Sequence, residues 1–267
     1  MDEGSEILLT GSKTYNTAGD HGNFVVPDSV HFINLFGCGG GDGGQSGTVN
    51  YGYQVPGAGG SGGNGSIAQF WHENGSISIP VNPGDVLRIL IGSGGRSDQT
   101  GGLTIITQQF AQAGSPDKRY LLGGGYNPVT LGGGAAARGR DMSGTGAPAP
   151  DPLHPGTIIL GGAGFITFRG NEDNHWGGGG GGGGAGMGPG GRGGDGGCDG
   201  GSQRGFPGGS HDPAFGAAHR GKPGSNGQGN GSGGGGGGGP GDGADDHVFD
   251  SGGPGGTGGD GYLAIRW

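Results

Sequence analysis

The sequence predicts an all-β protein, an antiparallel β-sandwich with an inserted bundle of polyglycine II helices. Three observations lead to this prediction. Runs of β-branched and aromatic residues recur along the chain, and no window has the 3.6-residue period of an amphipathic helix, so almost no α-helix is expected. Glycine accounts for 83 of the 267 residues, against an ordinary share of about 7%. Much of this glycine recurs as Gly-Gly-x triplets between segments of strand character.

The first part of the chain consists of strand candidates separated by turns. Residues 30–36 are stopped by Gly37, and their apolar side chains fall at both odd and even positions, which predicts a strand buried on both faces. Residues 86–91 follow the turn signal Asn82-Pro83-Gly84-Asp85. The other strand candidates are residues 6–10, 23–27, 66–71, 77–79, 103–110, 119–122, 157–160 and 165–168.

Strands bracket the longest glycine-rich region. About half of residues 177–261 are glycine, and the apolar run 262–267 that follows has only the N-terminal sheet to pack against. We therefore expect a mainly β-sandwich region with glycine-rich loops over residues 1–176. A polyglycine II helix bundle is expected over 177–261, and a final strand over 262–267 returns to the sandwich.

The triplets keep their register over several repeats. Residues 190–198 and 252–260 each hold three consecutive Gly-Gly-x triplets, and shorter runs occur at 40–45 and 59–64. A three-residue repeat matches the polyproline II helix, which has three residues per turn and no internal hydrogen bonds. Two glycines per turn leave two faces bare, so neighbouring backbones can exchange hydrogen bonds while x faces outward.

A flexible glycine linker is the alternative to an ordered bundle. Ordering a residue costs roughly 1–2 kcal/mol, whereas a hydrogen bond returns a net of only about 1 kcal/mol. Several helices can persist together if the bracketing strands fix their ends. The ordered bundle is favoured because linkers rarely hold register over three triplets or carry a proline such as Pro254 at the x position.

The longer interruptions of the glycine pattern are expected to be loops at the ends of the bundle. They span residues 169–176, 202–223 and 244–251 and contain aromatic and histidine side chains. Such side chains on a rigid support are typical of recognition surfaces, although aromatic residues that merely cover the ends of the bundle are the alternative. The candidate receptor-binding residues are His175, Trp176, Phe206, Phe215, His247 and Phe249, with Tyr126 as a further candidate.

Charge and composition exclude several classes of partner. Thirteen Lys and Arg against 22 Asp and Glu give a net charge of −9, which repels a phosphate backbone, so no nucleic-acid partner is expected. No apolar run is long enough to span a membrane and no signal peptide is readable, so no membrane insertion is expected. Cys38 and Cys198 lack the spacing of a metal site or disulfide framework and are interpreted as plain thiols, which leaves the redox compartment open.

No combination of residues in the sequence offers catalytic chemistry. The eight histidines are scattered without a metal-binding pair such as HExxH. A cluster of aspartates near the end of the glycine-rich region lacks calcium-ligand spacing and is interpreted as a solvated acidic loop rather than a cation site. These residues are Asp242, Asp245, Asp246 and Asp250. We therefore expect no enzyme, with no catalytic residues, no metal and no cofactor.

Three stretches resemble the glycine-rich domains of phage tail proteins. They are residues 24–37, which begin Phe24-Val25-Val26-Pro27, residues 77–95 around Asn82-Pro83-Gly84-Asp85, and residues 258–267, which begin Gly258-Gly259-Asp260-Gly261. The layout is also similar to the extracellular glycine-rich domain of the anaplastic lymphoma kinase receptor family, although only two cysteines and no kinase domain are present. The expected helix bundle resembles that of T-even tail-fibre tip adhesins.

The resemblance implies host-surface recognition at a tail tip. It leads us to expect a phage tail-tip or minor tail protein, located in the virion at the tail tip or tail fibre. The expected partners are a bacterial surface receptor and other phage tail proteins, and a homotrimer follows from family analogy alone. The alternative is a purely structural minor tail protein that packs between virion subunits. An ice-binding protein is a third reading, which the uneven, charged loops disfavour.

Overall fold

A computed structural model describes about three-fifths of the chain. The described residues are 11–47, 62–66, 77–112, 114–122, 136–137, 146–151, 153–154, 156–164, 182–194, 223–238 and 252–267. They form β-strands and no helix, which confirms the all-β prediction for this part of the chain. The strand candidates 6–10 and 165–168 lie outside the described residues, as does most of 66–71.

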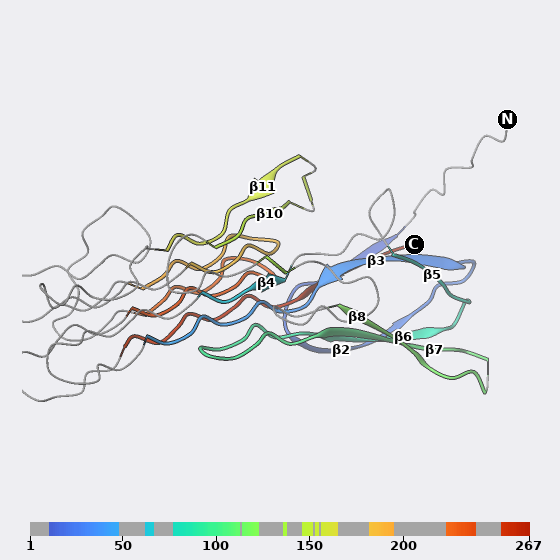
Figure 1. Cartoon of the computed structure of the whole chain (residues 1–267). Coiled ribbons are helices and arrows are strands. Elements are labelled where there is room, and N and C mark those ends of the chain that lie inside the picture. The colour runs from blue at the N-terminus through green and yellow to red at the C-terminus, as the bar shows by residue number, and fades with distance from the viewer. Residues whose placement is uncertain are drawn as a thin grey trace, which may run out of the picture.

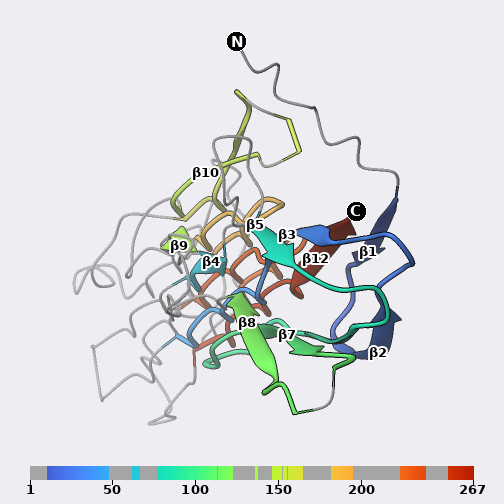
Figure 2. The ribbon, with the colours of Figure 1, turned by 90° about the vertical axis from the view of Figure 1, so that its right-hand side faces the viewer.

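Eight strands form two four-stranded antiparallel sheets (Figures 1 and 2). The first sheet has the order β1 (Ser12–Tyr15), β12 (Tyr262–Arg266), β3 (Phe32–Cys38) and β5 (Ile77–Pro80). The second has the order β2 (Gly19–Val25), β6 (Val86–Ile91), β7 (Thr104–Gln109) and β8 (Lys118–Leu122). Two short pairs complete the set, β4 (Gly65–Ser66) with β9 (Ala136–Ala137) and β10 (Ala149–Pro150) with β11 (Ile158–Ile159).

One buried apolar cluster contains side chains from both sheets. Along β6, buried Leu87, Ile89 and Ile91 alternate with exposed Arg88 and Leu90, so one face of the second sheet is turned to this cluster. The first sheet contributes Ile33, Leu35, Ile79, Leu263 and Ile265, and the second also contributes Phe24, Ile106 and Leu122. The polar strand β1 was missed from the sequence because only Tyr15 of its four residues is buried.

The prediction that residues 30–36 form a strand buried on both faces is wrong for the first half of β3. Phe32 is 56% exposed, whereas Phe36 and Cys38 are buried on the face of the sheet that lies away from the main core. Met187, from a distant glycine-rich segment, packs against this second pair of residues. Within the described part of the chain, the outer face is therefore covered where that segment reaches it, at Phe36 and Cys38.

The glycine-rich segments extend from one end of the sheets in a common direction (Figure 1). We call residues 39–47, 62–66, 92–102, 160–164, 182–194, 223–238 and 252–261 the glycine lattice. Within it, residues 39–47 continue β3, residues 92–102 join β6 to β7, and residues 252–261 lead into β12. Because β3 and β12 are the middle strands of one sheet and β6 and β7 those of the other, the lattice is covalently rooted in the centre of both.

Backbone hydrogen bonds hold the lattice together and repeat at every third residue. The N–H groups of Gly41, Gly44 and Gly47 donate at 2.8 or 2.9 Å to carbonyls in residues 253–259, which run antiparallel to them. The N–H groups of that segment at the same three-residue spacing donate in turn to residues 232–238. Successive residues of one segment thus form hydrogen bonds with different neighbouring segments. In this way the backbone N–H and carbonyl groups find partners without forming a regular sheet.

Residues 231–238 occupy the centre of the lattice. They are buried along their whole length and exchange backbone hydrogen bonds with six surrounding segments. The six are residues 39–47, 62–66, 182–186, 188–194, 223–229 and 252–261. A Cβ atom added at Gly234 would overlap the carbonyl of Gly256, so only glycine allows the backbones to approach this closely.

Candidate functional site

The end of the lattice farthest from the sheets, here called the far end, is where several described segments stop (Figure 1). Gly47 donates to Gly253, and Gly253 donates to Gly238, so these three residues lie at one level. Gly194 donates to Gly236, close to the same level. The chain therefore runs to the far end before residues 195–222 and 239–251.

All the sequence-predicted recognition residues lie outside the described residues. These are His175, Trp176, Phe206, Phe215, His247 and Phe249, and the same holds for Tyr126, Cys198 and the aspartates at 242–250. The described structure neither brings these side chains together nor separates them. It does place the residues that flank their stretches, which are Gly164 and Gly182, Gly194 and Pro223, and Gly238 and Gly252.

Near the far end, the carboxylate of Asp98 fixes the turn of the hairpin 92–102 to the rest of the lattice. It accepts hydrogen bonds from Ser46 Oγ at 2.6 Å, from the Ser46 N–H at 2.9 Å and from Ser97 Oγ at 3.0 Å. The hydroxyl of Ser97 accepts from the Gly255 N–H at 2.9 Å. Partial burial opposes the charged carboxylate, but the hydrogen bonds from Ser46 and Ser97 outweigh it and hold the pKa of Asp98 below its usual range.

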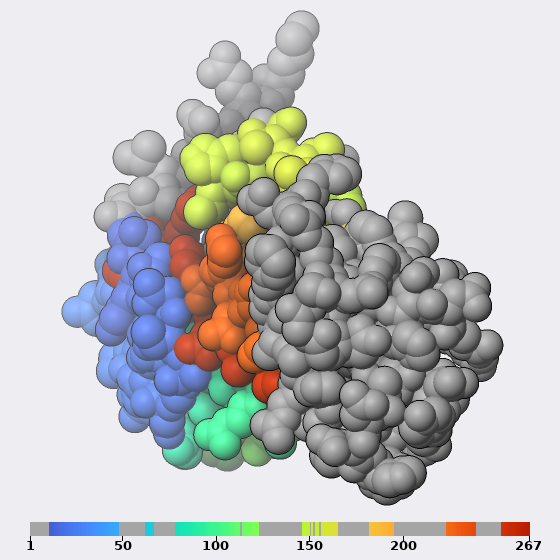
Figure 3. Space-filling view, turned by 90° about the vertical axis from the view of Figure 1, so that its left-hand side faces the viewer, coloured from blue at the N-terminus to red at the C-terminus, as the bar shows by residue number. Residues whose placement is uncertain are grey.

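A hairpin on the side of the lattice carries apolar side chains that the sequence analysis did not single out. It contains β10 and β11, and Figure 3 shows it crossing the top of the molecule in the view from the far end. Leu153, Ile158 and Leu160 are 53%, 64% and 68% exposed. Three exposed aliphatic side chains within eight residues are typical of a surface that another protein covers.

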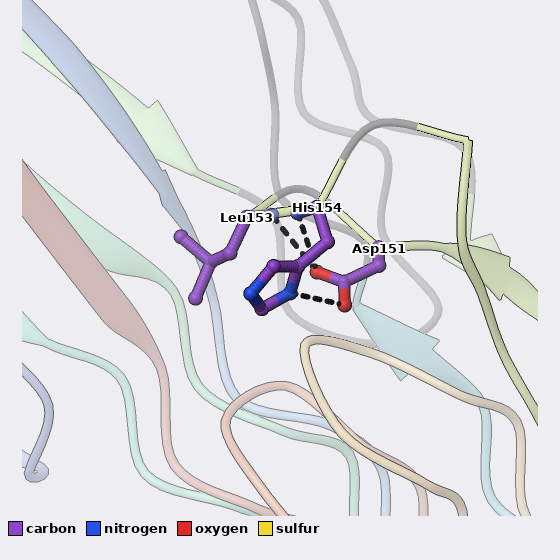
Figure 4. Close-up of polar contacts among 3 residues, drawn as sticks. All are labelled: Asp151, Leu153 and His154. Atoms are coloured by element: carbon purple, nitrogen blue, oxygen red, sulfur yellow. Dashed lines mark hydrogen bonds and ion pairs between the residues drawn. The ribbon is translucent and has the colours of Figure 1, made fainter.

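The turn of this hairpin is held by Asp151 (Figure 4). Its Oδ1 accepts from the N–H groups of Leu153 at 2.8 Å and His154 at 3.2 Å, and its Oδ2 lies 2.9 Å from His154 Nδ1. The hydrogen bond from the His154 ring, followed by that from Leu153, holds the pKa of Asp151 below its usual range. The Asp-Pro pair at 151–152 could have indicated this turn, since Asp commonly opens turns of this kind.

The lattice is attached to the first sheet by the turn that contains Asn230. Its side-chain Nδ2 donates to the carbonyls of Asn16 at 3.0 Å, Asp260 at 3.2 Å and Gly261 at 2.8 Å. The carbonyl of Asn230 accepts from the N–H of Met187 at 2.8 Å. This bond joins the turn to the segment around Met187, whose side chain packs on the first sheet. One amide side chain thus connects the lattice to the segments beside β1 and β12.

Replacing Asn230 with alanine should destabilise the protein by about 2 kcal/mol, because the partly buried Gly261 carbonyl would lose its side-chain donor and the bonds to Asp260 and Asn16 would be lost with it. Urea unfolding followed by circular dichroism would measure the loss. Asn226→Ala is the matched control, since Asn226 is exposed and, among the described residues, its side chain accepts a single hydrogen bond, from the Thr257 N–H at 3.0 Å. An equal loss in the two variants would contradict the attachment role of Asn230.

Neither a metal-ligand cluster nor a reactive thiol occurs among the described residues. No group of three or more His, Cys, Asp or Glu side chains that could hold a metal ion occurs among them. Cys38 is a free thiol whose burial raises its pKa to about 12, so it keeps its proton at neutral pH and is not a nucleophile. In this part of the chain there is also no helix of the length and hydropathy that crossing a membrane requires.

The sequence matches no known protein-family model, and no curated protein resembles it closely enough to be counted as a relative.

Proposed function

We propose that this protein recognises a molecule on a bacterial surface, as a tail-tip or minor tail component of a virion, through loops at the far end of the glycine lattice. The position of the flanking residues carries the proposal. The described chain reaches the far end on both sides of residues 195–222, which contain Phe206 and Phe215. The same is true of residues 239–251, which contain His247 and Phe249.

The third aromatic stretch is flanked in the same way. Ala163 precedes residues 165–181, which contain His175 and Trp176, and its carbonyl accepts from the N–H of Gly193 near the far end. Stretches that are remote in sequence thus leave the lattice on one surface. Residues on a shared, rigid support lose less conformational freedom on binding, which favours recognition by several loops together.

We infer that the lattice segments are polyglycine II helices and that the two sheets form a β-sandwich. The repeat of backbone hydrogen bonds at every third residue supports the first inference, because a polyglycine II helix has three residues per turn. The single buried cluster with side chains from both sheets supports the second. In this interpretation the sandwich is the base and the helix bundle is the scaffold that presents the loops.

Binding of the labelled chain to bacterial cells tests the proposed recognition. Trp176→Ala should weaken binding by on the order of 2 kcal/mol if Trp176 is an anchor, and the other five candidates should be scanned in the same way. Phe32→Ala is the control, because Phe32 is exposed on the first sheet, away from the lattice. Unchanged binding in all six loop variants would reject the proposal.

The exposed hairpin favours a second candidate, a structural minor tail protein that packs between virion subunits without receptor contact. Leu153, Ile158 and Leu160 would then be covered by a neighbouring subunit. Replacing all three with serine should reduce incorporation into particles while leaving cell binding by the isolated chain unchanged. If cell binding is absent and incorporation depends on the hairpin, the structural alternative replaces recognition.

A further inference from the structure

The segments of the lattice differ in how they are connected to the sheets. Residues 39–47, 92–102 and 252–261 continue middle strands of the two sheets through the covalent chain. Residues 182–194 and 223–238 have no such connection, since no described strand lies between β11 and β12. Among the described residues, the lattice therefore combines segments that continue directly into a strand with segments that hydrogen bonds and close packing hold between them.

The segments that do not continue directly into a described strand are also those that flank the stretch 195–222. A pull on that stretch away from the sheets would act along residues 188–194 and 223–229 (Figure 1). Each of these segments is bonded to several others: Ser225 donates to Arg192, while Gly224 and Gly227 donate to residues 254–257. The load would consequently spread to residues 252–261 and from there into β12.

The direction of the hydrogen bonds determines how such a load is resisted. They join segments that lie side by side, so they run across the segment axes, and neighbouring segments are bonded at several levels along their length. A pull along the axes strains the bonds of all levels together, whereas a sideways pull can open them one level at a time. Each hydrogen bond contributes a net of only about 1 kcal/mol, but opening many of them at once requires the summed free energy of all of them.

We propose that the glycine lattice is a load-bearing stalk, which transmits tension along its axis from the far end to the middle strands of both sheets. This mechanical function goes beyond recognition and does not depend on which molecule the loops bind. The segments rooted in β3, β6, β7 and β12 carry the load into the sheets. The central segment 231–238 is bonded directly to residues 39–47 and 252–261, and both of these are bonded in turn to residues 92–102.

Single-molecule pulling of the whole chain in two directions tests the proposal. For the axial direction, one handle is inserted in the stretch 195–222 and the other follows Trp267 at the opposite end of the molecule (Figure 1). For the sideways direction, handles are placed in the turns at 96–99 and 152–156, which lie on opposite sides of the lattice (Figure 1). At equal loading rate, we expect an axial rupture force several-fold above the sideways force, because forced unfolding depends on the barrier along the pulled direction.

An axial rupture force equal to or below the sideways force would overturn the proposal. Hydrogen exchange on the unmodified chain provides an independent test that needs no handles. In a lattice that yields as a unit, the hydrogen-bonded amides of residues 233–235 and 237 should be protected to the same extent as those of β3 and β12, because exchange would require the same global opening. Faster, independent exchange of residues 233–235 and 237 would also overturn the proposal. Cell binding plays no part in either measurement, so failure here is distinguishable from failure of recognition.

Discussion

Replacing Gly234 with alanine should destabilise the protein by on the order of 3 kcal/mol, because the new methyl group has no space. Its Cβ would overlap the backbone carbonyl of Gly256 and lie 2.9 Å from the Thr257 carbonyl carbon. Backbone cannot move aside as the end of a flexible side chain can. Gly234 also donates to Asp42 and accepts from Gly63, so any shift strains bonds to two further segments. Chemical unfolding of the two proteins would measure the loss.

Gly102→Ala is the matched control for this substitution. An alanine Cβ at Gly102 would lie 3.0 Å from the Ser93 nitrogen and farther from other atoms, a contact that a small shift at the edge of the lattice relieves. The loss of unfolding free energy should therefore be well below that of Gly234→Ala. Equal losses would mean that the intrinsic cost of replacing glycine, and not close packing in the centre, determines the stability of the lattice.

The sequence predicted the period of the lattice but not its centre. The expectation that the x residues face outward holds only in part. Pro254 and Thr257 are exposed, but Asp260 is half-buried and accepts hydrogen bonds from the N–H groups of Ala18 and Gly94, and Asp42, the x residue of the triplet 40–42, is buried. The central segment, however, includes the uninterrupted glycine run 233–238, which the triplet rule did not single out. The run 233–238 has neighbours on every side and so no outward face on which a side chain could lie. That property depends on the surrounding segments, and the local sequence pattern does not encode it.

Strands were predictable where apolar residues and turn signals coincide. β6 has the predicted bounds of residues 86–91, after a turn in which Gly84 has a φ of +81° and Asp85 donates its N–H to the Asn82 carbonyl at 3.0 Å. β1 was missed because it is a polar edge strand whose place depends on its pairing with β12. Such pairing joins residues far apart in sequence, which local patterns do not encode.

The candidate site was predictable only as a set of residue types. Aromatic and histidine residues stand out against glycine in any reading of the sequence, and their stretches fall where the lattice is interrupted. The exposure of Leu153, Ile158 and Leu160 could not be predicted in this way. An apolar run such as 157–160 indicates a buried strand unless the packing around it is known, because burial is a property of the surrounding segments.

Replacing Asp85 with asparagine should lower the free energy of unfolding by on the order of 3 kcal/mol at neutral pH. The new side-chain NH₂ group would face hydrogen-bond donors in a buried site, where it cannot accept from them. The Asp85 carboxylate accepts from the Ala111 N–H at 2.9 Å, from the Asn82 N–H at 3.0 Å and from Gln108 Nε2 at 3.0 Å. Asp85 and Gln108 are both fully buried. The single side-chain oxygen of asparagine could accept from some of these three donors, but its NH₂ group would then point towards another of them.

The same contacts make this contribution depend on pH. Burial alone would raise the pKa of Asp85, but the hydrogen bonds from Ala111, Asn82 and Gln108 outweigh burial and leave the pKa below its usual range. A carboxyl group whose pKa is lower in the folded than in the unfolded state stabilises the fold above the unfolded pKa of about 3.9. That stability is lost as the pH falls from there through the folded pKa.

The difference in unfolding free energy between the parent and Asp85→Asn should therefore be largest at neutral pH and shrink below about pH 4. Urea unfolding at a series of pH values would measure it. Asp98→Asn serves as the comparison, because the Asp98 pKa is also lowered but the residue is exposed and solvent screens its interactions. A difference for Asp85→Asn that stays constant down to pH 2 would show that Asp85 acts through its shape in the turn and not through its charge.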